Sequence, residues 1–298
     1  MKKIIVILIL SLSFVGRSAL AELKVVASTS DLASIAKYIG GDKISVKYIV
    51  DGRSDAHFVE VLPNYMVMVS RADVYLKVGL GLDFWAQLII DGSRNSKIQI
   101  VDCSQGIEVL GKPSGQVNAS MGDVHAEGNP HYQLDPADGL IMARNIEAGL
   151  VEADPANTAA YEAGLKSFED QLNSKLAQWQ KEAEPLKGLQ IITFHESWPY
   201  FSRAFGIEIV GFIEPKPGIE PTASHTAEII DLIKIRGIKI IGKEPYFSNK
   251  APNVIARETG ARVVDLPQMV GGSPGTDTYF ALFDTLLARL NAAAGSNP

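Results

Sequence analysis

A long amphipathic segment in the middle of the chain constrains the fold more than any other feature. It begins at Asp154-Pro155, a typical helix start, and its apolar residues recur at three- and four-residue spacing: Tyr161, Leu165, Phe168, Leu172, Leu176 and Trp179. About thirty helical residues extend about 45 Å at 1.5 Å per residue. Because a compact βα unit does not need so long a helix, residues 154–184 are predicted to form a rigid helix between two lobes.

Strand-like and helix-like segments alternate on both sides of this helix. The β-branched, strand-like runs cover residues 23–28, 44–50, 73–79 and 98–102 before it and 189–194, 207–213, 238–242 and 262–266 after it. Amphipathic segments that predict helices cover residues 31–40, 63–71, 84–91, 198–205, 226–236, 251–259 and 277–293. This alternation is typical of mostly parallel sheets with helices on their faces. The predicted fold is therefore α/β, with one βα lobe over residues 22–153 and another over residues 185–298.

The first 21 residues have the pattern of a secretory signal peptide, with Met1-Lys2-Lys3, an apolar run and small residues that end at Ala21. The apolar run from Ile4 to Gly16 is shorter than the roughly twenty residues that a membrane-spanning helix needs. We expect cleavage before Glu22 and export to the periplasm. A lipid anchor would require a cysteine at the new amino terminus, and the only cysteine is Cys103, so we expect a protein without a lipid anchor.

Composition and motifs argue against several classes of protein. The lone Cys103 cannot form an intramolecular disulfide, and as a residue that closes a strand it is expected to be a small buried hydrophobe. The formal net charge of -6 argues against nucleic acid as a partner. The chain has no G-x-S-x-G or P-loop motif, and no G-x-G-x-x-G follows the first strand. His195-Glu196 begins like a zinc-protease helix, but Pro199 stands where H-E-x-x-H requires its second histidine, so binding is favoured over catalysis.

Three of the five histidines stand alone in loop-like segments: His57, His131 and His195. His195 directly follows a predicted strand, at the edge where open α/β sheets place their ligands. The Asn-Pro pair before His131 restricts the backbone and can fix the direction of the histidine side chain. Neutral imidazole suits zinc and its neighbouring transition metals, and three imidazoles with one carboxylate would complete a tetrahedron. Individually, His57 and His131 are equally consistent with surface residues, so the metal site is a hypothesis about the group.

Three further residues are weaker candidates. Asp265 lies where a predicted strand gives way to a loop, and an isolated aspartate there is more often a turn or capping residue. His125 lies six residues before His131 in a polar segment that we interpret as a mobile loop. It could be an accessory ligand, but a solvated loop residue is the favoured interpretation. His225 begins a predicted helix, and we leave it outside the site.

Several motifs occur together and in order along the mature chain. They are Val25-Val26-Ala27-Ser28-Thr29, Asp55-Ala56-His57, Gly128-Asn129-Pro130-His131 with Leu134-Asp135-Pro136, Phe194-His195, Lys243-Glu244-Pro245 and Val263-Val264-Asp265-Leu266. With these motifs the chain resembles the periplasmic substrate-binding proteins of zinc and manganese ABC transporters, a family whose two lobes are joined by a rigid long helix. The N-P-H-x-x-L-D-P motif is specific, and the resemblance covers essentially the whole mature chain.

The resemblance implies a metal site in the cleft between the lobes, with His57, His131, His195 and Asp265 as ligands, two from each lobe. It also implies zinc, because manganese members often place a carboxylate at the position of His195, whereas zinc favours imidazole. The chain departs from the family pattern in two places. Ala56 replaces the usual proline, and His125 is the only histidine in a loop where many zinc members carry a long histidine-rich insertion.

The function expected from this resemblance is capture of periplasmic Zn²⁺ and its delivery to an inner-membrane ABC permease. The protein would act as a monomer, would not be an enzyme, and could be loaded by a periplasmic metal chaperone. One alternative is a binding protein for Mn²⁺ or another divalent metal in the same class of transporter. A second is a zinc-dependent hydrolase with an open coordination position and Glu196 or Glu244 as its base. A third is a binding protein for an organic or chelated ligand.

Overall fold

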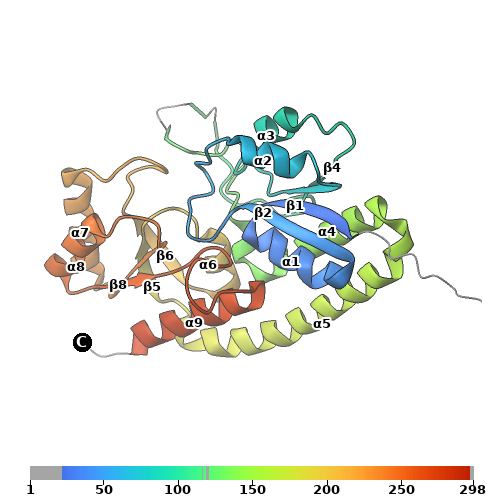
Figure 1. Cartoon of the computed structure of the whole chain (residues 1–298). Coiled ribbons are helices and arrows are strands. Elements are labelled where there is room, and N and C mark those ends of the chain that lie inside the picture. Colours follow the sequence, from blue (N-terminus) through green and yellow to red (C-terminus); the bar gives the residue numbers. More distant parts are fainter. Residues whose placement is uncertain (1–21, 116, 119–120, 296–298) are drawn as a thin grey trace, which may run out of the picture.

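The computed structural model of the protein describes residues 22–115, 117–118 and 121–295. The predicted signal peptide, residues 1–21, lies outside these described residues. Figure 1 shows two sheets, one in the blue-to-green part of the chain and one in the yellow-to-red part, with a long helix along their base. Within the described ranges, no helix combines the length and apolar character that crossing a bilayer requires.

The N-terminal lobe is built on a four-stranded parallel sheet with the strand order β2-β1-β3-β4. Its strands are β1 (Leu23–Thr29), β2 (Ile44–Val50), β3 (Val74–Lys77) and β4 (Gln99–Asp102). Val25 in β1 is in register with Val46 on one side and with Val74 on the other. Helices on the two faces of the sheet are α1 (Ser30–Gly40) and α4 (Pro136–Ala153) on one side and α2 (Pro63–Val69) and α3 (Ala86–Ser93) on the other (Figure 1). The β-branched runs therefore form parallel strands, as the sequence predicts, and the central strands β1 and β3 are largely buried.

The C-terminal lobe repeats this plan with the strand order β6-β5-β7-β8, again parallel throughout. Its strands are β5 (Gln190–Thr193), β6 (Glu208–Phe212), β7 (Ile240–Lys243) and β8 (Arg262–Asp265). Its helices are α6 (Pro199–Phe205), α7 (Ala223–Arg236), α8 (Lys250–Thr259) and α9 (Tyr279–Gly295). The predicted fold class, α/β with two parallel sheets and a long helix, is confirmed.

The long helix α5 spans Thr158–Ala183 and is 26 residues long. It is shorter at both ends than the predicted segment 154–184, because Pro155–Asn157 and Glu184–Leu186 form separate 3₁₀ turns. Its large buried residues Tyr161, Phe168, Leu172 and Trp179 belong to the predicted apolar stripe. Phe168 and Trp179 lie with their ring centroids 5.1 and 6.4 Å from that of Phe280 in α9. The helix therefore packs along the C-terminal helix as well as along the first lobe.

Gly164 lies where α5 packs closely against the end of α1. A Cβ added at Gly164 would lie 2.1 Å from the carbonyl oxygen of Ile39. An alanine in an exposed helix interior stabilises a protein by about 1 kcal/mol relative to glycine. For Gly164→Ala we expect the opposite sign, a loss of about 1–3 kcal/mol from overpacking, which thermal unfolding measures. Gly295→Ala is the matched control, since nothing lies within 4 Å of its added Cβ, and an unchanged melting temperature for Gly164→Ala would contradict the expected packing.

Hydrogen bonds beside α1 also join the two lobes. Ser30 Oγ donates a hydrogen bond to the carbonyl oxygen of Val270 at 2.7 Å, and the Val270 amide donates to Asp31 Oδ1 at 2.9 Å. Burial raises the pKa of the Asp31 carboxyl to about 7. The hydroxyl of Tyr279 donates to the carbonyl oxygen of Gln133 at 2.8 Å. The lobes are therefore held together by these contacts in addition to α5.

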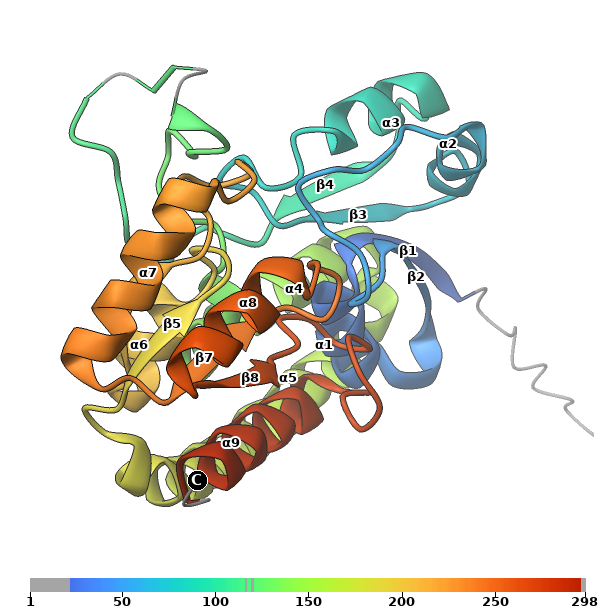
Figure 2. The same ribbon diagram turned by 90° about the vertical axis from the view of Figure 1, so that its left-hand side faces the viewer.

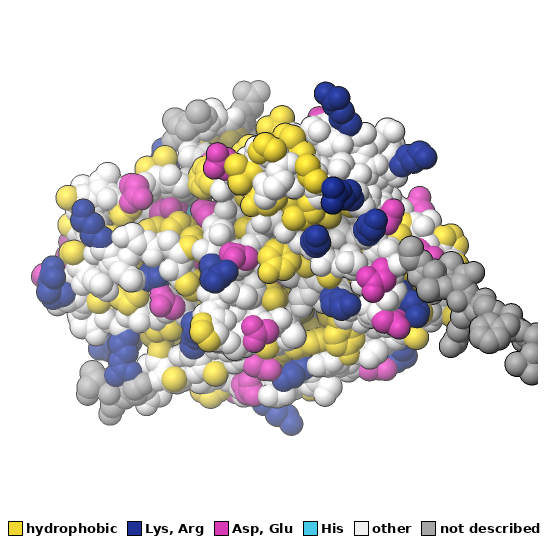
Figure 3. Space-filling view, viewed as in Figure 1, with side chains coloured by type: hydrophobic (Ala, Val, Ile, Leu, Met, Phe, Trp, Pro, Cys, Tyr) yellow, Lys and Arg dark blue, Asp and Glu magenta, His cyan; other side chains and the backbone are white. Residues whose placement is uncertain are grey.

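The surface over α2 and α3 is partly apolar. Figure 3 shows hydrophobic side chains gathered over these two helices. The exposed large apolar residues of this region are Val67 in α2, Phe84 just before α3 and Leu88 within it. Helices α2 and α3 therefore expose more apolar surface than is usual for helices that face only water.

Candidate metal centre

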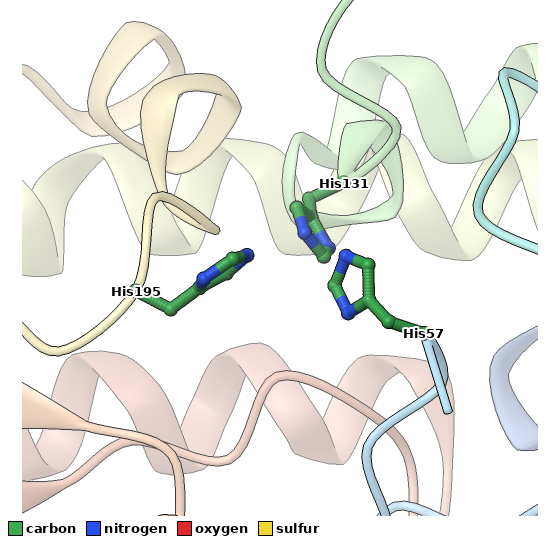
Figure 4. A group of neighbouring side chains, drawn as sticks. All are labelled: His57, His131 and His195. Carbon is green, nitrogen blue, oxygen red and sulfur yellow. The ribbon is translucent and has the colours of Figure 1, made fainter. Parts of the chain in front are cut away.

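Three histidines that are far apart in the sequence meet between the two lobes. One ligand nitrogen from each of His57, His131 and His195 can be chosen so that all three lie within 4.8 Å of one another. Their side chains are buried, with residue exposures of 5%, 1% and 5%. The ring of His57 lies with its centroid 5.1 Å from the centroids of both other rings, and Figure 4 shows the three rings converging from separate segments.

The three side chains come from loops at the ends of secondary-structure elements. His57 lies in the loop between β2 and α2, His131 directly precedes the 3₁₀ turn that leads into α4, and His195 follows β5. Two histidines therefore belong to the N-terminal lobe and one to the C-terminal lobe. The predicted placement of His195 at the carboxyl end of a strand agrees with the structure.

His131 is held in place from both lobes. Its amide donates to Asn129 Oδ1 at 3.0 Å, as expected for an Asx turn. Asn129 in turn donates through Nδ2 to the carbonyl oxygen of Glu196 at 2.7 Å, and its own carbonyl oxygen accepts from the Tyr200 hydroxyl at 2.8 Å. The histidine in the N-P-H motif therefore sits on a segment that the C-terminal lobe braces.

Carboxylates orient two of the three rings. Nδ1 of His57 lies 2.7 Å from Asp55 Oδ1, and Nδ1 of His195 lies 2.6 Å from Glu214 Oε2. If each Nδ1 carries the proton and donates it to the carboxylate, each Nε2 keeps its lone pair. A second partner of this kind is usual for histidines that bind metals, because it fixes the tautomer and makes the ring a better donor.

Free nitrogen lone pairs collect at the centre of the group. Among the described residues, the buried polar atoms without a hydrogen-bond partner include Nε2 of His57 and both ring nitrogens of His131. A buried polar atom without a partner costs about 1–3 kcal/mol, and native proteins contain few of them. Several such atoms on neighbouring rings are explained if an electron-pair acceptor binds between them.

The pKa values of His131 and His195 are shifted in opposite directions. Burial, together with the charges of His57 and His195, lowers the pKa of His131 well below its usual value, so this ring is neutral. For His195 burial also opposes protonation, but the hydrogen bond that its ring donates to Glu214 and the charges of Glu244, Glu214 and Asp55 outweigh burial and raise the pKa. Protons therefore compete more strongly for the ring of His195 than for that of His131.

Glu244 adds a buried carboxyl beside His195. Its Oε1 accepts hydrogen bonds from Ser197 Oγ at 2.7 Å and from Trp198 Nε1 at 3.0 Å. Its Oε2 has no partner, and burial raises the pKa of the carboxyl to about 7. A second buried carboxyl, besides that of Glu214, therefore lies beside His195, and its raised pKa means that it binds a proton more readily than an ordinary glutamate.

Asp265 does not join the group of three histidines. Its Oδ1 lies 2.7 Å from Lys243 Nζ, and its side chain is 54% exposed while that of Lys243 is 1% exposed. A buried ammonium needs a counter-charge, and Asp265 supplies it. Asp265 as the fourth ligand, which the family resemblance implies, therefore stays a prediction. It requires the Asp265 carboxylate to leave Lys243 and bind the metal instead.

The other candidates have distinct positions. His125 is partly buried rather than solvated, its ring centroid lies 5.3 Å from that of His57, and burial lowers its pKa to about 4. His225 lies in the first turn of α7, where Nε2 is 2.9 Å from the carbonyl oxygen of Phe212. Cys103 is fully buried, as expected for a small hydrophobe. The interpretation of His125 as a solvated loop residue is the one that the structure corrects, because the segment folds over His57.

Sequence reasoning missed the role of Glu214 and gave Glu244 only a catalytic one. Both follow predicted strands that neighbour the strand before His195, so the carboxyl ends of adjacent parallel strands could have drawn attention to them. Their pairing with particular ring nitrogens depends on side-chain direction, for which the sequence holds no signal.

The chain is similar to known metal-binding transport proteins over most of its length. A family model for ZnuA, the periplasmic zinc-uptake complex component A, matches residues 25–293. PsaA of Streptococcus pneumoniae, a manganese ABC transporter substrate-binding lipoprotein, is 31% identical over 233 residues, which cover 76% of this chain and 72% of PsaA. MntA of Halalkalibacterium halodurans, a manganese-binding lipoprotein, is 27% identical over 280 residues, which cover 90% of this chain and 89% of MntA.

Solved structures share the fold over nearly the whole described chain. A crystal structure of ZnuA matches with a TM-score of 0.81 and 26% identity, covering 92% of this chain and 100% of that one. A zinc-bound deletion mutant of ZnuA matches with a TM-score of 0.79 and 27% identity, covering 93% of this chain and 100% of that one. The two lobes and the long helix are therefore common to this chain and to proteins of known structure.

Proposed function

The chain belongs to the ZnuA family of periplasmic zinc-uptake components, and from that premise we propose that it binds Zn²⁺ through His57, His131 and His195. Proteins of this family are substrate-binding components of ABC transporters, so the chain is an extracytoplasmic metal-binding protein and not an enzyme. Its metal is delivered to an ABC permease. The observation that carries the proposed site is the convergence of three buried imidazoles with unpartnered nitrogens.

The preference for zinc over manganese follows from the donor atoms. Three imidazole nitrogens form a borderline-soft site that suits zinc, whereas manganese favours harder, oxygen-rich sites. Manganese is the second candidate, because PsaA and MntA are named for it. By the Irving–Williams order of metal affinities, the same nitrogen donors would also hold copper, nickel and cobalt in vitro.

The remaining parts of the proposal concern the mature protein. We propose residues 22–153 and 185–298 as the two metal-binding lobes and residues 154–184 as the link. We also propose a monomer that is released into the periplasm by signal cleavage and that a metal chaperone could load. Cys103 is buried at the end of the N-terminal sheet, so its thiol is not accessible for attachment of a lipid.

Elemental analysis tests the identity of the metal. The protein is purified from its native compartment without chelators and without added metal, and its metals are quantified against protein. We expect about one zinc per chain, and competition titrations with a fluorescent chelator should give a tighter Kd for Zn²⁺ than for Mn²⁺. Co-purification of manganese, with weaker binding of zinc, would reject zinc as the cargo.

Glu214→Gln is predicted to weaken zinc binding about tenfold, near the lower end of the 10–100-fold range for partners of ligating histidines. The amide can still accept from Nδ1 of His195, so the ring keeps its orientation but loses the nearby negative charge. Chelator competition at pH 7.5 measures the change. Glu208→Gln, on the strand that leads to Glu214, is the control, since its side chain is hydrogen-bonded to Gln190. Equal affinities for both variants would argue against Glu214 as a partner of the ligand.

A further inference from the structure

The loop between β8 and α9 joins the two lobes at a seam. We call residues 266–272 the seam loop. Ser30 Oγ donates to the carbonyl oxygen of Val270 at 2.7 Å, and the Val270 amide donates to Asp31 Oδ1 at 2.9 Å. Figure 2 shows this orange-red part of the chain reaching across to the blue helix α1. Both backbone polar groups of one residue of the seam loop are therefore held by the first two side chains of α1.

The seam is tightly packed. A Cβ added to Gly52, in the loop after β2, would lie 2.4 Å from the carbonyl oxygen of Val270 and 2.4 Å from the amide nitrogen of Gly272. Backbones can approach this closely only where one residue has no side chain. The seam loop thus lies against two segments of the N-terminal lobe, and the lobes cannot part here without breaking the two hydrogen bonds of Val270.

A small cavity lies beside the Asp31 carboxyl. Its volume of about 10 Å³ has room for one water molecule at most. Asp31 and Gln133 both line it, and Asp31 Oδ2 and Gln133 Oε1 are both buried without a hydrogen-bond partner among the described residues. Native proteins leave few buried acceptors unpaired, because each has lost its hydrogen bonds to water. Two such oxygens at one cavity therefore require a donor between them.

The side chains around the cavity do not supply this donor. The Tyr132 hydroxyl donates to the carbonyl oxygen of Val78 at 2.6 Å, and the Tyr279 hydroxyl donates to the backbone carbonyl oxygen of Gln133 at 2.8 Å. Apart from Thr29, the remaining wall is apolar and consists of Leu32, Val78, Leu82 and Met142. A proton on Asp31 Oδ2 would donate to Gln133 Oε1 and so give both unpaired oxygens a partner in a single bond.

The cations of the surrounding elements are engaged elsewhere. Lys37, on the same helix as Asp31, donates to a backbone carbonyl oxygen just beyond the far end of that helix, at 2.7 Å. Arg203 of α6 pairs with Asp135 and Asp138, which lie at the start of α4. Asp31 therefore has no counter-charge among the described residues, and an ionised carboxylate there would be buried without one.

The remaining titratable groups around Asp31 are carboxyls and phenols. Asp83, after β3, accepts hydrogen bonds from two amides of its own loop. Burial raises the pKa values of Tyr132 and Tyr279 well above their usual range, so both phenols stay protonated. Burial also raises the pKa of the Asp31 carboxyl, to about 7, although the amides of Val270 and of Asp31 itself favour the ionised form. No neighbouring charge therefore favours ionisation of Asp31.

We propose that Asp31 is a proton-operated latch that holds the two lobes together at the seam. In the protonated form, Oδ2 donates to Gln133 Oε1 while Oδ1 accepts from the Val270 amide, so one carboxyl binds both lobes. When the proton leaves to solvent, both oxygens at the cavity are acceptors, and the carboxylate is stabilised by moving into water, away from Val270. The latch does not depend on which metal the protein binds.

The latch is closed at low pH and opens as the pH rises. Because the folded protein binds this proton more tightly than an exposed aspartate does, the stabilisation is complete at low pH and is lost as the pH rises through about 7. The seam also fixes the lobe that carries His195 relative to the lobe that carries His57 and His131. A closed latch therefore keeps the three rings close together.

NMR of the metal-free mature protein tests the proton directly. The ¹³C resonance of the Asp31 carboxyl, assigned through the backbone of its own residue, should titrate with a midpoint near 7. The carboxyl of Asp42 is the reference within the same protein, because its side chain is 86% exposed and its pKa is lowered by Lys43. A midpoint for Asp31 below about 5, in the range of ordinary aspartates, would overturn the latch. It would mean that a water or the Gln133 amide donates to Oδ2 instead.

Hydrogen exchange of the Val270 amide tests whether the proton closes the seam. In the wild type the protection factor should fall about tenfold per unit between about pH 5 and 6.5 and level off above about pH 7.5. Asp31→Asn should lack this decline, because its side-chain amide donates to Gln133 at every pH. The ratio of the two proteins cancels the effects of other groups, such as Asp138, whose pKa is raised by burial to about 6. Asp42→Asn is the matched control, since it removes the same charge at an exposed position, and it should behave as the wild type does.

Ser30→Ala separates the latch from the part of the seam that does not depend on pH. Loss of the bond to the Val270 carbonyl oxygen should lower the protection factor about 2–10-fold at every pH and leave the decline in place. An unchanged protection factor would contradict the seam contact itself. If the wild type and Asp31→Asn show the same decline with pH, Asp31 is not the latch and the inference is overturned. The proposed zinc function would then stand, since neither measurement involves the metal.

Discussion

His195→Ala is expected to lower the affinity for zinc by more than about 100-fold. The replacement removes the only histidine that the C-terminal lobe contributes to the group of three. Loss of a direct ligand should exceed the 10–100-fold cost of losing a hydrogen-bonding partner of a ligand. The replacement also leaves the buried Glu214 carboxylate without the His195 Nδ1 that lies 2.6 Å from it. The hydrogen bond between the loop after β5 and the loop after β6 is then lost.

Competition with a chelator of known affinity measures this effect at pH 7.5. His225→Ala is the control, because it removes a histidine whose ring nitrogens are already engaged elsewhere. Circular dichroism and thermal unfolding of the metal-free protein establish that the fold is intact. A His195→Ala variant that is folded and binds zinc as tightly as the control would rule out the three-histidine site.

Zinc affinity is expected to fall about 10–100-fold between pH 7.5 and 5.5, because protons and zinc compete for the same imidazole nitrogens. The sign follows from His195. Its raised pKa means that the ring begins to bind protons at a higher pH than an ordinary histidine does. Affinity is therefore full above that pKa and is lost as the pH falls through it, while His131 stays neutral over most of the range because burial lowers its pKa.

Titrations at several pH values in one buffer series measure this dependence. Glu214→Gln is an informative companion, because loss of the carboxylate should lower the pKa of His195 and move the decline to lower pH. Affinity that does not change between pH 7.5 and 5.5 would contradict ligation by these imidazoles.

The contacts between the lobes bear on how zinc leaves. Helix α5 and the hydrogen bonds of Ser30 and Asp31 to Val270 join the lobes on the side of α1. A wide hinge opening would break these contacts and expose the buried Asp31 carboxyl.

Most of the fold could be predicted from local patterns. The run 44–50 became β2 with the same bounds, and the stripe from Tyr161 to Trp179 became the buried face of α5. Such predictions succeed because the periods of strands and helices are set within a few residues. The limits of α5 were less predictable, since the flanking 3₁₀ turns continue a helical pattern with different hydrogen bonds.

The metal centre could also be predicted only in part from local patterns. His57, His131 and His195 were candidates because of residue type and their positions at turns and strand ends, both of which are visible along the chain. Three contacts are not visible along the chain: the ion pair of Asp265 with Lys243, the hydrogen bond of His195 to Glu214, and the proximity of His125 to His57. Each joins residues from different loops, and which atoms meet depends on how the two lobes and their loops pack. The chain thus specifies the donors locally, whereas the packing selects among them, because hydrogen bonds and ion pairs form only between atoms that the fold brings within about 3 Å.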